Sequence, residues 1–212
     1  MAPTTRVYIE RGAKRTFASA ADWPGWCRSG KDEASALEAL AAYAPRYAKV
    51  AKLARAEFPK DPTNFTVVER LKGNATTDFG APGIPAKDES NPLTTRETER
   101  MAQLVEACWK YLDQVRANAP ASLTKGPRGG GRERDEMFEH VLGAEVEYAK
   151  KIGLREKQPA WNDAGAVKGF RTTLGASLRD SYREEKWPVP YAARRTAWHA
   201  LDHAWEMEDR IP

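Results

Sequence analysis

The stretch Thr196-Ala197-Trp198-His199-Ala200-Leu201-Asp202-His203-Ala204-Trp205-Glu206 decides how this chain is interpreted. It places His199 and His203 four residues apart, and at helical pitch this spacing puts both rings on one face, one turn apart. The sequence holds three histidines, and the third, His140, lies in a separate helical pattern. Two imidazoles from one helix and one from a facing helix can hold a single divalent ion and leave coordination positions open. We therefore predict a metal site formed by His140, His199 and His203.

Two alternatives for the histidines stay open at this point. A histidine in a helix is commonly a surface or core residue, and a His-x-x-x-His pair also arises by chance. Nearby carboxylates leave a similar choice, because Glu206 and Glu147 fall on the faces of His203 and His140. Each could be a fourth ligand, a partner of a ligand or a general base, but a solvated glutamate is the favoured interpretation of both. Asp202 is predicted to point away from the histidines.

Composition limits the class of protein. With 212 residues, 41% hydrophobic and 30% charged, the chain can form one large or two small domains with a real core. It has no apolar run of about 18 residues and no apolar signal core near its start, so we expect a cytoplasmic protein without membrane association. Cys27 and Cys108 are expected to be free, buried thiols. The net charge of +4 permits an anionic ligand but does not favour nucleic acid.

The first part of the chain, residues 1–80, has the patterns of a small α+β domain. Alternating apolar residues predict an antiparallel sheet, and the 31–40 stretch predicts a helix with Asp32 as its N-cap. A second helix is predicted to continue it at an angle after Pro45. The predicted strands are 6–10, 14–20, 64–71 and, pairing with the last, 75–79; the predicted helices are 31–40 and 46–58.

Residues 81–92 are rich in proline and glycine, which predicts a linker between two domains. The remaining residues, 93–212, show helical periodicity, and four such helices make a bundle, a fold that commonly builds metal sites from facing helices. We expect the two parts to pack together through Trp23 and Trp26, and Trp198 and Trp205 to wall a cleft at the site. The predicted helices are 94–118, 134–152, 163–184 and one that follows Pro188.

A glycine-rich segment precedes the helix that carries His140. Gly129-Gly130-Gly131, flanked by Arg128, Arg132 and Arg134, could cradle an anion with backbone amides at the positive end of that helix. The alternative is a flexible, solvated loop. No Gly-Lys-[Ser/Thr] sequence follows, so the segment is not a Walker A loop.

The second part resembles the DinB-like family of four-helix metalloproteins over residues 93–210. The likeness lies in Glu139-His140-Val141-Leu142-Gly143-Ala144-Glu145 and in the His199-x-x-x-His203 pair on the last helix. The family pattern is one histidine on the second helix and such a pair on the fourth, and all three positions are filled here. The resemblance implies a divalent ion, zinc, nickel or iron, held by three imidazoles. It also implies transfer or isomerisation with a low-molecular-weight thiol such as mycothiol, bacillithiol or glutathione.

The first part resembles a HicB-like domain over residues 5–50. Val7-Tyr8-Ile9-Glu10, the Phe17-Ala18 strand, Trp23-Pro24-Gly25-Trp26-Cys27 and Gly30-Lys31-Asp32-Glu33-Ala34 follow its strand–strand–turn–helix plan. Such domains bind a partner toxin that acts on RNA. No separate DNA-binding helix-turn-helix follows, which argues against an antitoxin.

Two hypotheses of function result. The first is a metal-dependent thiol transferase, isomerase or related hydrolase with a small-molecule substrate, whose metal lowers the pKa of a bound thiol or water. No catalytic residue is assigned beyond the three histidines. The second is a non-catalytic binding protein whose first domain docks a protein or RNA partner. A homodimer is left open under both.

Overall fold

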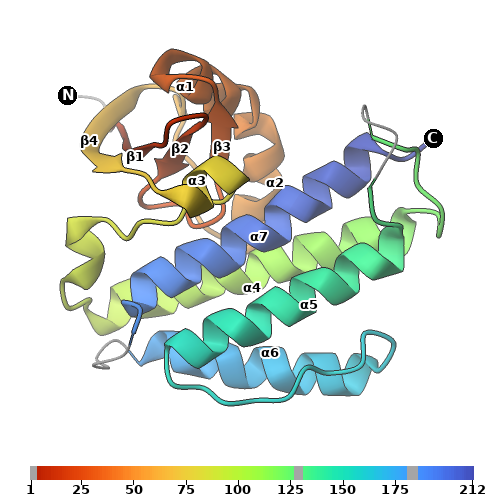
Figure 1. Cartoon of the computed structure of the whole chain (residues 1–212). Coiled ribbons are helices and arrows are strands. Elements are labelled where there is room, and N and C mark those ends of the chain that lie inside the picture. Colours follow the sequence, from red (N-terminus) through yellow and green to blue (C-terminus); the bar gives the residue numbers. More distant parts are fainter. Residues whose placement is uncertain (1–3, 127–130, 181–185) are drawn as a thin grey trace.

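A computed structural model describes residues 4–126, 131–180 and 186–212 of the chain. It is an α+β structure in which a small sheet with its own helices lies against one side of a group of four long helices (Figure 1). The predicted fold class is confirmed at this level. The described residues form four strands and seven α-helices.

The sheet has the strand order β3-β2-β1-β4. The predicted hairpin is confirmed, because β1 (Thr5–Arg11) pairs antiparallel with β2 (Thr16–Ala20), which pairs antiparallel with β3 (Cys27–Gly30). The prediction of a wholly antiparallel sheet is wrong, since β4 (Phe65–Lys72) runs parallel to β1. Two helices separate β3 from β4, and a connection of this length lets a strand return in the parallel sense.

The two helices of that connection follow the local signals of the sequence. Helix α1 (Glu33–Ala42) begins after Asp32, whose side chain accepts a hydrogen bond from the Ser35 N–H, as predicted. Helix α2 (Ala44–Leu53) has proline in its first turn, where the missing N–H costs nothing. It ends before the predicted residue 58, because Arg55 adopts a left-handed φ of 54°.

Residues 75–79 are not the predicted strand. They form a short helix, α3 (Ala75–Phe79), because the Asn74 side chain accepts hydrogen bonds from the N–H groups of Thr76 and Thr77. The predicted linker also contains a 3-10 turn, η1 (Lys87–Ser90).

The four predicted long helices are confirmed as α4 (Thr95–Asn118), α5 (Arg134–Lys151), α6 (Ala164–Arg179) and α7 (Val189–Asp209). Helix α6 stops short of the predicted residue 184, because the backbone leaves helical geometry at Asp180; residues 181–185 lie outside the described part. Helix α7 packs against both α4 and α5, and α6 packs mainly on α4 (Figure 1). Among the described residues, no helix combines the length and apolar character that a membrane crossing requires.

The sheet part and the helical part share one hydrophobic core, as predicted. Trp26 is fully buried, and its indole N–H donates to the Leu40 carbonyl. Gly25, with a φ of +94°, lies so close to α7 that a Cβ there would be 2.8 Å from Leu201 Cδ1. The turn that carries the two N-terminal tryptophans therefore rests directly on the helix that carries His199.

Candidate metal centre

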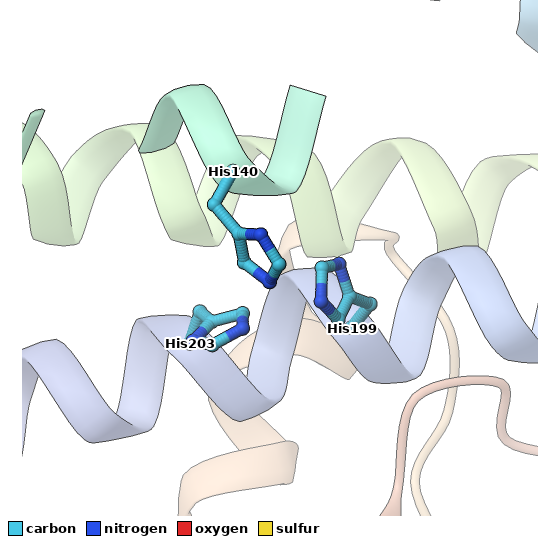
Figure 2. Close-up of side chains that lie close together, drawn as sticks. All are labelled: His140, His199 and His203. Carbon is cyan, nitrogen blue, oxygen red and sulfur yellow. The ribbon is translucent and has the colours of Figure 1, made fainter. Parts of the chain in front are cut away.

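The three histidines come together between α5 and α7. His199 and His203 lie one turn apart on α7, whose residues are almost all buried, and His140 reaches toward them from α5 (Figure 2). The helical spacing of the pair and the contact of α5 with α7 bring the three rings to one place. The predicted grouping is present in the structure.

The spacing of the rings suits one ion. The ring centroids are 4.9 Å apart for His140–His199, 5.1 Å for His140–His203 and 4.7 Å for His199–His203. One ring nitrogen from each lies within 4.8 Å of the other two. Since nitrogen ligands sit about 2.0–2.1 Å from zinc, a small closing movement of the rings brings all three into one coordination sphere.

Glu206 fixes the orientation of one ring. Its Oε2 lies 3.0 Å from His203 Nδ1, and its Oε1 accepts a hydrogen bond from Arg210 at 3.0 Å. A carboxylate on one ring nitrogen leaves the other nitrogen as the available ligand atom. The hydrogen bond to His203 also lowers the pKa of Glu206. Of the two carboxylates considered from sequence, Glu206 is therefore the one that contacts the site, and the favoured interpretation of Glu206 as a solvated glutamate is wrong.

The other two rings are held neutral. Burial, more than any charge, lowers the pKa of His199 well below its usual value and that of His140 to about 4. Neutral imidazole keeps the lone pair that a metal needs. In addition, His199 Nδ1 is buried without a hydrogen-bond partner in the described structure, and buried polar atoms of this kind require an explanation. A bound ion would account for both features, so the residues present fit a metal.

Several other candidates lie away from this centre. Glu147 is exposed and pairs with Lys150, and Asp202 turns away to pair with Arg28 at 2.9 Å. The favoured solvated interpretation is confirmed for Glu147.

The thiols are free and buried, as predicted. Burial raises the pKa of Cys27 to about 12 and raises that of Cys108 as well, which makes both inert as nucleophiles at neutral pH. In the glycine segment, residues 127–130 lie outside the described ranges, so Arg128, Gly129 and Gly130 are not placed. Arg132 is exposed near the start of α5.

A cavity of about 700 Å³ lies beside the centre, between the sheet and α7. Glu206, Asp202 and Trp198 line it from α7, and Phe17 and Arg28 line it from the sheet. Glu206 connects the cavity to the metal centre, because the same carboxylate contacts His203.

Trp198 lines this cavity, although none of the three histidines is among its lining residues, and the expectation for Trp205 is wrong. Trp205 is 1% exposed and packs edge-on against Tyr43 at 4.9 Å, because its position on α7 faces the shared core.

Two residues near the centre were not singled out from sequence. Arg195 precedes His199 by four residues, so helical spacing could have placed it on the same face. Tyr148 lies with its ring centroid 6.0 Å from that of His199. Its place follows from how α5 packs on α7, for which the sequence carries no local signal.

Comparison with family models, with curated proteins and with solved structures finds no match for this chain. Its function therefore has to be argued from the site itself.

Proposed function

We propose that this protein is a metal-dependent enzyme of DinB-like type that transfers or isomerises a small molecule with a low-molecular-weight thiol, or hydrolyses it. The observation that carries the proposal is the convergence of all three histidines of the chain on one point between two helices. The N-terminal part, with its HicB-like order of elements, is proposed to serve as one wall of the substrate cavity.

The donor set supports a catalytic rather than a closed structural metal. Three imidazoles leave a four-coordinate ion one position short, and the described residues offer no cysteine to the group. A divalent zinc, nickel or iron ion held there would act as a Lewis acid and lower the pKa of a thiol or water.

The residues of the chain supply the rest of the site. Glu206 holds the ring of His203, and the neighbouring cavity combines the indole of Trp198 with charged groups at its rim. A volume of about 700 Å³ is of the size that small-molecule sites have, and its many charged lining residues suit a polar substrate.

The test is a titration of the cobalt-loaded protein with millimolar 2-mercaptoethanol, followed by visible absorption. We expect a new thiolate-to-cobalt band in the wild type and in the control variant Glu147→Gln. Glu147 lies on α5, as His140 does, but it is exposed and outside the site. His140→Ala should lack it. A cobalt spectrum that thiol does not change would favour a closed structural site and a binding role for the protein instead.

A further inference from the structure

Arg195 is a buried cation next to the metal centre. It lies on α7 one turn before His199, and its side chain is sandwiched between the rings of Tyr148 and Trp198, at 5.1 and 4.9 Å from their centroids. Its Nη1 donates to the Pro82 carbonyl at 2.9 Å, and its Nη2 donates to the Tyr148 hydroxyl at 3.1 Å. Its Nε is buried and has no hydrogen-bond partner among the residues that the structure describes.

No carboxylate of the described residues forms an ion pair with Arg195. Two buried glutamates, Glu89 and Glu145, have other partners. Glu89 pairs with Arg194 at 2.7 Å, and Glu145 pairs with Arg171 at 3.2 Å. A buried charge without a counter-charge is costly. Because no described carboxylate neutralises Arg195, its positive charge acts on the side of the metal centre where His199 lies.

Glu10 approaches Arg195 only through a peptide group. The carbonyl of Pro82 accepts from Arg195, and the N–H of the same peptide, on Gly83, donates to Glu10 Oε1 at 2.7 Å. Glu10 also accepts from the N–H of Ile84 and from Thr77. The carboxylate oxygens of Glu10 are thus engaged by these donors, and the Pro82–Gly83 peptide stands between Glu10 and Arg195.

Tyr148 presents a second free donor. Its hydroxyl oxygen accepts from Arg195, and within the described ranges its own hydrogen has no acceptor. The ring is half-buried and lies against His199. Two N–H or O–H groups without acceptors, Arg195 Nε and Tyr148 Oη, therefore lie together beside the ligand His199.

We propose that Arg195 and Tyr148 bind an anionic group, a carboxylate, of the small molecule that occupies the metal centre. The inference rests on the proposed function, and it specifies the substrate class of the same site. A carboxylate would accept charge-assisted hydrogen bonds from both donors and would offset the positive charge that Arg195 and a divalent ion bring together. Arg132, exposed and without an ion pair in the part of the chain described, adds to this potential, because its charge acts on His140 and His199.

The experiment compares two thiols that differ in charge. Cobalt-loaded protein is titrated with mercaptoacetate, which carries a carboxylate, and with 2-mercaptoethanol, which does not. In the wild type we expect mercaptoacetate to bind at least tenfold more tightly. In Tyr148→Phe, which removes only a hydroxyl, and in Arg195→Gln the preference should fall toward unity while 2-mercaptoethanol binds as before. Thermal unfolding of Tyr148→Phe checks that the fold is retained.

Arg70→Gln is the matched control, because Arg70 is an exposed arginine that pairs with Glu33 at 2.8 Å and lines neither the cavity nor the metal centre. An unchanged preference in this variant supports the inference. Arg28→Gln alters the wall of the neighbouring cavity, and loss of the preference there but not in Tyr148→Phe would move the carboxylate to the cavity and overturn the inference. Equal binding of the two thiols by the wild type would also overturn it, with the thiol-dependent function left standing.

If neither thiol changes the cobalt spectrum, the proposed thiol function fails, and a second arm decides the inference. Calorimetry of the zinc-loaded protein then measures acetate against acetamide. Acetate binding that weakens at least tenfold in Tyr148→Phe, with acetamide not bound, supports the anion site. If the wild type and Tyr148→Phe bind acetate equally, or if neither binds it, the inference is contradicted.

Discussion

At the scale of single residues, the contact between Glu206 and His203 does most to orient the site. A carboxylate on the second ring nitrogen sets the tautomer and raises the basicity of the ligand. We expect Glu206→Gln to weaken metal binding about 10- to 100-fold, measured by competition with a chelator of known affinity. The exposed Glu147→Gln should bind as the wild type does. Equal affinities for all three proteins would show that Glu206 does not support the site.

The buried imidazoles predict how the metal-free protein responds to acid. Burial lowers the pKa of His199 well below its usual value and that of His140 to about 4, whereas histidines of an unfolded chain titrate near pH 6.5. The unfolded chain therefore binds more protons in this range, and stability is full above about pH 6.5 and falls as the pH drops toward about 4.

Urea denaturation of the metal-free protein at several pH values between about 4 and 7.5 measures this slope. His199→Gln removes one of the titrating groups, so its stability should depend on pH less steeply. The same slope in the variant and the wild type would mean that other groups cause the acid response.

The sequence predicted the residues of the site better than their surroundings. The grouping of the three histidines follows from helical spacing, which is a local property of the chain, whereas for Glu206 the favoured interpretation of a solvated glutamate is wrong. Tyr148 could not be found in this way, because its contact with Arg195 joins residues 47 apart in sequence. The exact role of a tryptophan was also beyond the pattern, since Trp205 lies on nearly the same side of α7 as Trp198 but two turns further along, where it meets Tyr43 instead of Phe17.

At the scale of helices, α5 and α6 are joined by a buried ion pair. Arg171 contacts both oxygens of Glu145 at 3.2 Å, and the side chains are 7% and 0% exposed. Glu145→Ala should destabilise the protein by about 3–5 kcal/mol, because Arg171 keeps only the exposed Asp113 as a partner. Chemical denaturation measures the change.

The double variant Glu145→Leu/Arg171→Met is the control for that pair. Replacing a buried ion pair by apolar residues of similar volume is often neutral or stabilising. The free energy of unfolding of this variant should therefore be higher than that of the wild type or lower by no more than about 1 kcal/mol. If Glu145→Ala alone lowers the free energy of unfolding by less than about 1 kcal/mol, water or a rearranged side chain must compensate the charge of Arg171.

Long helices were predicted from sequence because their apolar periodicity extends over many residues. The short helix at residues 75–79 was not, since these five residues carry no clear period and the cap at Asn74 decided the outcome. The parallel pairing of β1 with β4 was missed for a different reason: strand direction depends on the path of the connecting helices, not on the alternation within the strand.

At the scale of the whole molecule, the sheet part and the bundle are joined by buried polar contacts as well as by a common core. Glu89 of the 3-10 turn contacts Arg194 of α7, and both are buried. The segment predicted as a linker between two domains is therefore anchored on the helix that carries the metal ligands.

Proteolytic cleavage between the two parts tests whether their contacts hold them together. A specific protease site inserted between the exposed residues Asn91 and Pro92 would leave Glu89 on one piece and Arg194 on the other. After cleavage we expect both pieces to elute together from a sizing column and to separate only in denaturant. Separate elution as two stable fragments under native conditions would contradict the shared core.

The most direct measurement of the central claim is the metal content of the purified protein by mass spectrometry. We expect one zinc, nickel or iron ion per chain in the wild type. We expect a sharp loss of metal in His140→Ala, His199→Ala and His203→Ala, each with its helical circular dichroism retained, and full metal content in Glu147→Gln. A wild-type protein that binds no ion, or a His140→Ala variant that retains as much metal as the wild type, would contradict it.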